Sequence, residues 1–257
     1  MSSGVDTGAV CVVLPTYNEA ANLEAIAAAI LNAVPAGRLL VVDDNSPDGT
    51  GDIADRIALL DARVSVLHRR GKEGLGRAYL DGFRAALHDK ADVVVQMDAD
   101  FSHDPAALPE LIAPILGGEA DLVIGSRYVA GGRVLDWGYG RKLISRGGSL
   151  FARVVLGLDA HDLTGGFKAW AAGLLASMPL EGVRAGGYVF QIEMTYRADR
   201  AGARITEVPI TFRDRLAGVS KMSKRIVLEA LWIVLRLRAE EIACVLRRRA
   251  TPETPSA

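Results

Sequence analysis

Two carboxylates separated by a single residue follow a short run of β-branched residues. Residues 93–97, Val-Val-Val-Gln-Met, have the composition of a buried strand, and Asp98 and Asp100 come directly after them. Two acids this close repel each other unless a cation lies between them, and proteins hold Mg²⁺ or Mn²⁺ through carboxylates together with substrate phosphates. The spacing predicts a divalent-metal site, while an Asp-x-Asp pair on its own also fits a solvated surface loop.

Alternating strands and helices in the first half of the chain must position these carboxylates. The predicted strands cover residues 9–14, 39–42, 64–67, 93–97 and 122–124, and the predicted helices cover 22–34, 51–60, 77–87 and 105–116. This alternation is typical of a mostly parallel sheet with helices on both faces. Such α/β sheets bind ligands beyond the carboxyl ends of their strands.

Polar residues follow three of the predicted strands at that edge. They are Asp43 and Asp44, Asp98 and Asp100, and Ser126 and Arg127. Their convergence favours a nucleotide site over a solvated loop. A glycine loop at 71–76 resembles a phosphate cradle, but it lacks the Gly-Lys-Ser/Thr ending of a P-loop, so we interpret it as a turn with a flexible backbone.

The second half of the chain carries another group of polar residues. A glycine-rich loop at 131–140 leads into a predicted helix at 141–156, on which Arg141 and Ser145 share one face. A cation and a hydroxyl there suit an anion such as phosphate, although the spacing alone favours a solvated basic face. We further predict a turn at 162–168, a helix at 188–200, a strand at 204–212 and a basic loop at 213–221.

A predicted helix at 224–249 closes the fold. Arg225, Arg236 and Arg247 share one of its faces, opposite an apolar side. An amphipathic helix of this kind fits either a membrane surface or packing on its own domain. We divide the chain into a tail at 1–8, one α/β domain at 9–223, this helix at 224–249 and a second tail at 250–257.

Composition narrows the classes of function. The 257 residues are 50% hydrophobic and 24% charged with a net charge of −1, which suits a globular domain and offers no overall field to attract nucleic acid. Cys11 and Cys244 lack metal-ligand spacing, and we expect reduced thiols. We find no charged leader with an apolar core, and no run approaches the roughly 18–20 apolar residues of a spanning helix. We therefore expect a cytoplasmic protein.

Eight short motifs in a fixed order are similar to those of one family. They are Pro15-Thr16-Tyr17-Asn18-Glu19, the acidic run 43–50, Gly74-Leu75-Gly76, Met97-Asp98-Ala99-Asp100, Gly125-Ser126-Arg127-Tyr128, Ile144-Ser145-Arg146-Gly147, Asp162-Leu163-Thr164-Gly165 and Tyr188-Val189-Phe190-Gln191. Together they resemble the dolichyl- and polyprenyl-phosphate mannosyltransferases of glycosyltransferase family 2. The resemblance implies a GT-A fold for residues 9–223, with a mostly parallel, Rossmann-like sheet flanked by helices.

The resemblance also implies an inverting transfer of mannose from GDP-mannose to a polyprenyl monophosphate, with Mg²⁺ or Mn²⁺ as cofactor. By position, the expected donor-binding residues are Pro15, Tyr17, Glu19, Val42, Asp44, Asp98, Ala99, Asp100, Arg127, Arg215 and Lys221. The expected metal ligands are Asp98 and Asp100, which with Arg127 form the expected catalytic group; the acceptor phosphate is expected at Arg141 and Ser145, with Gln191 on the acceptor side. No general base is needed, because the acceptor phosphate is already anionic.

Some alternatives remain open. Certain family members carry a third polar metal ligand two residues past the second Asp, where this chain has the weaker ligand Ser102. A lipid acceptor implies contact with a membrane surface or a membrane-anchoring partner, at the cytoplasmic face. The rival functions are glucosyl transfer from UDP-glucose to the same lipid, a nucleotidyltransferase, and a non-catalytic subunit that binds a sugar nucleotide.

Overall fold

The computed structural model describes residues 9–183, 187–214 and 224–250 of the chain. Its centre is a seven-stranded sheet in the order β3-β2-β1-β4-β7-β5-β8. The strands are β1 Val10–Thr16, β2 Arg38–Asp43, β3 Val64–His68, β4 Val93–Gln96, β5 Leu122–Ser126, β7 Lys168–Ala171 and β8 Ile205–Pro209. All neighbours pair in parallel except β7, which is antiparallel to both β4 and β5. The predicted α/β class with a mostly parallel sheet is confirmed.

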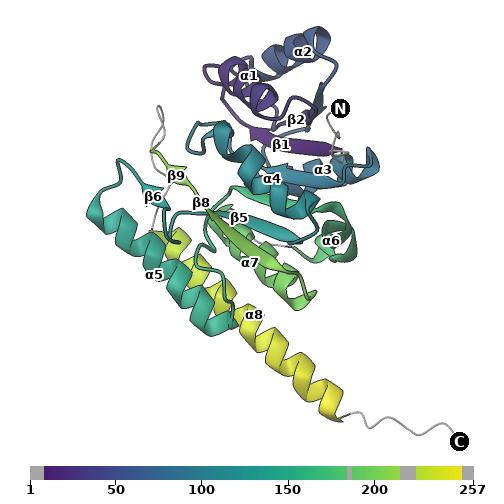
Figure 1. Ribbon diagram of the computed structural model, residues 1–257. Helices are drawn as coiled ribbons and strands as arrows, with labels where there is room; N and C mark the ends of the chain where they lie inside the picture. Colours follow the sequence, from purple (N-terminus) through teal and green to yellow (C-terminus); the bar gives the residue numbers. More distant parts are fainter. Residues whose placement is uncertain (1–8, 184–186, 215–223, 251–257) are drawn as a thin grey trace, which may run out of the picture.

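Helices cover both faces of this sheet (Figure 1). They are α1 Leu23–Ala33, α2 Thr50–Leu60, α3 Leu75–His88, α4 Leu108–Leu116, α5 Tyr139–Leu156, α6 Ala172–Ser177, α7 Gly187–Arg200 and α8 Lys224–Ala250, with short 3₁₀ helices at Pro105–Ala107 and Leu180–Gly182. Alternate residues of a strand point to opposite faces. In β1, Val12 and Leu14 therefore join the core under α1, α2 and α4, whereas Cys11 and Val13 join the core under α3 and α5 to α8.

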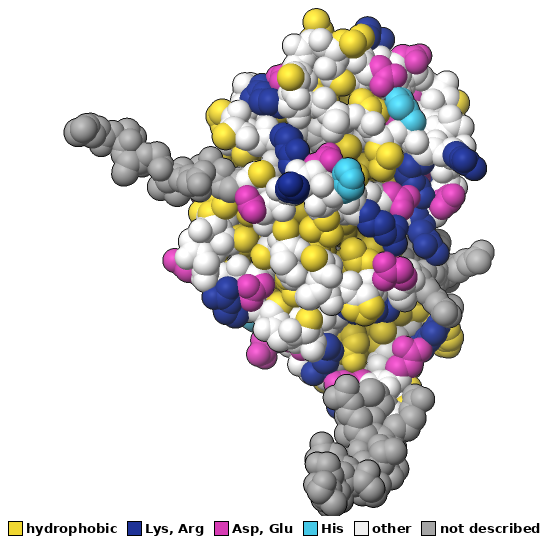
Figure 2. Space-filling model, turned by 90° about the vertical axis from the view of Figure 1, so that its right-hand side faces the viewer, with side chains coloured by type: hydrophobic (Ala, Val, Ile, Leu, Met, Phe, Trp, Pro, Cys, Tyr) yellow, Lys and Arg dark blue, Asp and Glu magenta, His cyan; other side chains and the backbone are white. Residues whose placement is uncertain are grey.

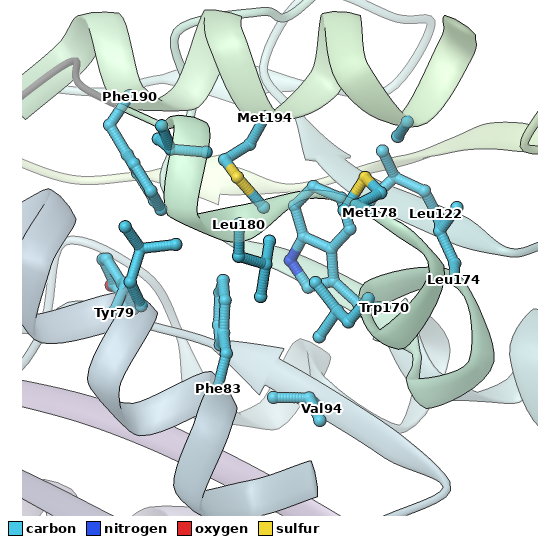
Figure 3. Close-up of a cluster of buried hydrophobic side chains, with 14 of the residues drawn as sticks. Tyr79, Phe83, Val94, Leu122, Trp170, Leu174, Met178, Leu180, Phe190 and Met194 are labelled. Carbon is cyan, nitrogen blue, oxygen red and sulfur yellow. The ribbon is translucent and has the colours of Figure 1, made fainter. Parts of the chain in front are cut away.

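The core under α3 and α7 is rich in aromatic and sulfur-containing side chains, among them Tyr79, Phe83, Trp170 and Met194 (Figure 3). A glycine permits this close packing, because a Cβ at Gly82 would overlap the side chain of Val13 on β1. Helix α3 is thereby drawn tightly onto the sheet, next to the end of β4.

Strand β7 is the main departure from the expected fold. The sequence indicated only a turn ending at Lys168, yet residues 168–171 form a central strand between β4 and β5. Lys168, Ala169 and Trp170 are all buried. The strand lacks β-branched residues and carries a lysine, so its local pattern resembles neither a buried nor a half-buried strand. Its place is decided by pairing with neighbours that are remote in the sequence.

The second half of the chain also builds a helical layer. Helices α5 and α8 lie side by side along one flank of the molecule (Figure 1). The expected strand at 204–212 is divided into β8 and a short strand β9, Thr211–Phe212, which pairs with β6, Arg133–Val134. Within the described residues, no helix is long and apolar enough to cross a bilayer. On the face in Figure 2, Lys and Arg side chains are interspersed with Asp and Glu side chains.

Candidate active site

The carboxyl ends of β1 and β2 bring together the residues expected to hold the nucleoside of a donor. Pro15 pairs in register with Val42, and the next pair is Thr16 with Asp43. Asp43 ties the following loop to the sheet, because its carboxylate accepts hydrogen bonds from the hydroxyls of Thr16 (3.1 Å) and Ser46 (2.6 Å). Asp43 therefore has a structural role at this edge.

Asp44 is buried beside a cation that sequence reasoning did not single out. Its carboxylate forms an ion pair with Arg69, and both side chains are buried. The same guanidinium contacts Asp81 (2.9 Å) and Glu73 (3.1 Å). Arg69 comes directly after β3 and belongs to no local motif, so only the fold reveals it. Arg69 holds the Asp44 carboxylate in one place. Nearby in the sequence, the ammonium group of Lys72 lies over the ring of Tyr17, 3.5 Å from the ring centroid.

The acidic pair lies immediately beyond β4. Asp98 is half-buried and accepts a hydrogen bond of 2.8 Å from the hydroxyl of Tyr79. Asp100 is buried and accepts one of 3.0 Å from the backbone N–H of Ser102. Phe101 has a left-handed backbone conformation, with φ of 57°, which produces this tight turn. Burial raises the pKa of Tyr79 well above its usual value, and the charge of Asp98 raises it further, so the phenol stays a donor.

The donor atoms at this turn fit a hard divalent cation. The hydroxyl of Ser102 is buried and, among the described residues, has no hydrogen-bond partner. Carboxylate oxygens are ligands that Mg²⁺ and Mn²⁺ prefer, and the hydroxyl of Ser102 would be a weaker third oxygen beside them. The described residues contain no cluster of three or more His, Cys, Asp or Glu that could hold a metal ion. Proteins that hold Mg²⁺ through one or two carboxylates usually complete its ligands with substrate phosphates and water.

Arg127, at the end of β5, is held in a buried ion pair. Its guanidinium donates two hydrogen bonds to Asp162, of 2.7 and 2.6 Å, and a third of 2.8 Å to the hydroxyl of Thr164. Burial opposes ionisation of Asp162, yet the charge and hydrogen bonds of Arg127 hold the pKa of that carboxyl below its usual value. The pair therefore stays charged, with one guanidinium edge turned towards a group of hydroxyls.

That group of hydroxyls lies along the buried face of α5. Ser145 accepts a hydrogen bond of 2.7 Å from the hydroxyl of Tyr128 and lies 3.3 Å from that of Thr164, which also lies 3.4 Å from Ser149. We call Tyr128, Ser145, Ser149 and Thr164 the hydroxyl cluster. Only Ser145 was expected here. The i, i+4 spacing of the two serines was the available signal for a second.

Arg141 points to a different set of partners from Ser145. Its guanidinium donates to both oxygens of Asp214 at 2.9 Å and lies over the ring of Trp137, 4.2 Å from its centroid. The charge of Arg141 is therefore already balanced by a carboxylate. An anion that binds here must share Arg141 with Asp214.

Gln191 belongs to a buried amide network behind the acidic pair. Its side-chain oxygen accepts a hydrogen bond of 2.8 Å from the amide nitrogen of Gln96, which also donates one of 3.0 Å to the carbonyl of Gly166. The indole N–H of Trp170 donates a hydrogen bond of 3.0 Å to the side-chain oxygen of Gln96. A Cβ at Gly166 would lie 3.3 Å from Asp98 Oδ2 and 3.5 Å from Gln191 Nε2. Gln191 is thus a near neighbour of Asp98.

Comparison with known proteins identifies the family to which the chain belongs. The family model described as glycosyl transferase family 2 matches residues 11–175. The chain belongs to glycosyltransferase family 2. It is 50% identical over 227 residues to an undecaprenyl-phosphate mannosyltransferase from Micrococcus luteus, covering 88% of this chain and 93% of the relative. It is 46% identical over 224 residues to a polyprenol monophosphomannose synthase from Mycolicibacterium smegmatis, covering 87% and 84%.

Solved structures agree with this membership. Glucosyl-3-phosphoglycerate synthase from Mycobacterium tuberculosis, in complex with phosphoglyceric acid, has a TM-score of 0.65 at 25% identity, covering 90% of this chain and 80% of that one. Its complex with Mn²⁺, UDP and glucosyl-3-phosphoglycerate has a TM-score of 0.60 at 26% identity, covering 96% and 82%. The family 2 glycosyltransferase described here thus shares its architecture with an enzyme solved with a divalent metal.

The structure does not bring all the expected site residues of this family 2 enzyme into one group. Eight of the residues expected to bind the donor lie at or just beyond the ends of β1, β2 and β4, and we call them the expected donor side: Pro15, Tyr17, Glu19, Val42, Asp44, Asp98, Ala99 and Asp100. Arg127, also expected to contact the donor, lies at the end of β5 with Asp162. Ser145 and Gln191 lie apart, in the hydroxyl cluster and the amide network, and Arg141 lies with Asp214. Arg215 and Lys221 fall outside the described residues. Sequence reasoning missed Arg69, Tyr79 and Ser149, and it named Tyr128, Asp162 and Thr164 only as members of the motifs, without a role in the site. All six contact partners distant in the sequence.

Proposed function

We propose that this family 2 enzyme transfers mannose from GDP-mannose to a polyprenyl monophosphate, with inversion at the anomeric carbon. The mannosyl group and the lipid-phosphate acceptor are those in the names of the two relatives at 50% and 46% identity. One observation carries the proposal. Arg127 donates to Thr164, which lies 3.3 Å from Ser145, so one hydrogen-bonded chain joins an expected donor contact to the expected acceptor site.

The chemistry of the reaction suits these groups. An oxygen of the acceptor phosphate forms the new bond to C1 of mannose, and the bond from C1 to the diphosphate of GDP breaks. Asp98 and Asp100 would hold a divalent cation, which would neutralise the charge that gathers on the leaving diphosphate. Arg127, together with the expected pair Arg215 and Lys221, would supply positive charge on the same side.

The proposed reaction needs no proton acceptor on the acceptor side. The acceptor phosphate is anionic at neutral pH, and Gln191, beside Asp98, carries an amide that cannot take a proton. His103 is enclosed between Phe167 and Phe212, and burial lowers its pKa to about 4, so it stays neutral. Hydroxyl donors can orient the phosphate without cancelling the charge that makes it a nucleophile.

A polyprenyl acceptor places the enzyme at a membrane, and α5 offers a surface for that contact. Tyr139, Leu143, Leu150 and Val154 lie on one side of α5 and are 87, 65, 59 and 72% exposed. The opposite side bears Ser145 and Ser149 of the hydroxyl cluster. Helix α5 contains no acidic residue and four basic ones, which are Arg141, Lys142, Arg146 and Arg153. We propose peripheral binding of this face to anionic lipid at the cytoplasmic side of the membrane.

A transfer assay tests the proposed function directly. The purified protein is mixed with labelled GDP-mannose or UDP-glucose and a polyprenyl phosphate, in the presence of Mg²⁺, Mn²⁺ or a chelator. Mannolipid formed only from GDP-mannose and only with metal supports the proposal. Glucolipid formed from UDP-glucose would instead show that UDP-glucose is the donor. Binding of a sugar nucleotide without product from either donor would favour a non-catalytic subunit.

A further inference from the structure

The phenol of Tyr79 lies directly against one of the two expected metal-binding carboxylates. Tyr79 is on the second turn of α3 and is fully buried, and its hydroxyl donates 2.8 Å to Asp98 Oδ1. We propose that Tyr79 is a positioning residue that fixes the orientation of the Asp98 carboxylate for a divalent cation. The inference rests on the proposed role of Asp98 as a metal ligand.

The ring of Tyr79 is itself held on two sides. It stacks on Phe190 of α7, with centroids 5.9 Å apart and planes 5° from parallel, and it lies 5.9 Å from Phe83 of its own helix. Figure 3 shows these three rings together in the buried cluster. Because the ring cannot move without disturbing both neighbours, the hydroxyl points in one direction. The hydrogen bond to Asp98 is therefore preorganised by packing, before any ligand arrives.

The second oxygen of Asp98 faces a different part of the protein. Asp98 Oδ2 lies on the side of Gly166, where an added Cβ would come within 3.3 Å of it. The two oxygens are thus distinguished: Oδ1 is bonded to a group from the core, and Oδ2 is directed towards the turn between Asp162 and β7. A carboxylate pinned through one oxygen keeps the other where a cation needs it, and such supporting hydrogen bonds are what orient metal ligands in general.

Asp100 provides an internal contrast. Its carboxylate accepts a hydrogen bond from the backbone N–H of Ser102, a donor that does not depend on the side chain at residue 102. Asp98 is oriented by a side chain, so a single oxygen can be deleted while the ring stays in place. Tyr79→Phe makes that deletion, and it should leave the stacking on Phe190 intact.

The test measures metal binding independently of turnover. The full chain and Tyr79→Phe are titrated with Mn²⁺ in the presence of GDP, and binding is followed by calorimetry. We expect the dissociation constant for Mn²⁺ to rise about tenfold in the variant. The kcat of mannosyl transfer should fall, and the KM for polyprenyl phosphate should be unchanged. Wild-type Mn²⁺ affinity in Tyr79→Phe would overturn the proposal.

A matched control separates this role from a general effect on the core. Tyr196, on α7, is another buried tyrosine, and its hydroxyl interacts with Arg200 and Glu241, away from Asp98. Tyr196→Phe should bind Mn²⁺ as the wild type does. If Tyr79→Phe does not fold, Tyr79→Met, which fills the apolar space without a hydroxyl, takes its place.

A double-mutant cycle shows whether Tyr79 acts through Asp98. In an Asp98→Asn background, Tyr79→Phe should cause no further loss of Mn²⁺ affinity. An equal loss in both backgrounds would contradict a role through Asp98. The readout also distinguishes this inference from the proposed function, because wild-type protein that binds Mn²⁺ with GDP but forms no mannolipid would refute the transfer and leave the effect of Tyr79 measurable.

Discussion

The residues expected to bind the donor and those expected to bind the acceptor are held in different ways at the sheet edge. On the donor side, charged groups are fixed one by one: Asp44 by Arg69, and Asp98 by Tyr79. Around the residues expected to bind the acceptor, neutral hydroxyls contact one another, and the cation Arg141 is paired with Asp214. Arg127 lies between the two sets and is paired with Asp162. This difference agrees with what the proposed mannosyl transfer would require of the groups that bind the donor and of those that bind the acceptor.

A leaving diphosphate gains negative charge, so the groups that meet it must bring a cation and hold it rigidly. An acceptor phosphate must instead keep its negative charge until it attacks. Hydroxyls and cations whose charge is already balanced can orient such a phosphate without lowering its reactivity. The contrast predicts that substitutions on the two sides change different kinetic quantities.

The largest effect is expected on the donor side. Asp100→Ala removes an expected metal ligand, and we expect metal-dependent transfer to fall by at least about a hundredfold while the fold is retained. Transfer rates and thermal unfolding are measured beside Asp52→Ala, which alters an exposed acid on α2. A wild-type rate in Asp100→Ala would remove the metal role from this side.

Arg127 joins the two sides, and its loss should affect the fold as well as activity. Arg127→Ala leaves Asp162 buried without its partner, which typically costs about 3–5 kcal/mol in the free energy of unfolding. Urea unfolding gives that value. Arg204→Ala is the control, because it breaks a similar pair with Asp121 at an exposed position and should unfold as the wild type does.

On the acceptor side, a substitution should change the response to lipid and spare the donor. Arg141→Ala should raise the KM for polyprenyl phosphate about tenfold, the size expected for one charge-assisted hydrogen bond. The dissociation constant for GDP-mannose, measured by calorimetry, should hardly change. Weaker binding of GDP-mannose by this variant would show that Arg141 contributes to the donor site and not to the acceptor site alone.

The smallest effect concerns the outer face of α5. Leu143→Ser with Leu150→Ser should weaken binding to anionic vesicles several-fold, because each leucine loses apolar contact with lipid. Sedimentation with the vesicles measures this. Leu59→Ser with Leu60→Ser removes two leucines that are 86 and 88% exposed on α2, and these should not affect binding. Turnover of a short-chain acceptor in solution should be the same in both variants.

An equal loss of vesicle binding after the α2 changes, or wild-type binding after the α5 changes, would show that α5 is not the contact surface. The difference between the donor and acceptor regions would then concern only their polar groups and would not extend to lipid binding by α5.

The sequence by itself determined the elements of the first half and the position of the acidic pair. Hydrophobic runs of β-branched residues alternate there with helical periods, and Asp98 and Asp100 follow such a run. Those signals are local, because burial on both faces of a parallel strand demands a continuous apolar run. All seven of the strands and helices that the structure describes before residue 100 begin within two residues of the expected positions.

Only the tertiary structure decided which groups meet. Strand β7 lies between β4 and β5 because of pairing across many residues, and no pattern within residues 168–171 encodes it. The bonds from Tyr79 to Asp98 and from Arg127 to Asp162 likewise join separate elements. A residue's type states what it can bind, but its partner depends on how remote elements pack. The orientation of the carboxylates, and with it the chemistry, is therefore a property of the folded chain.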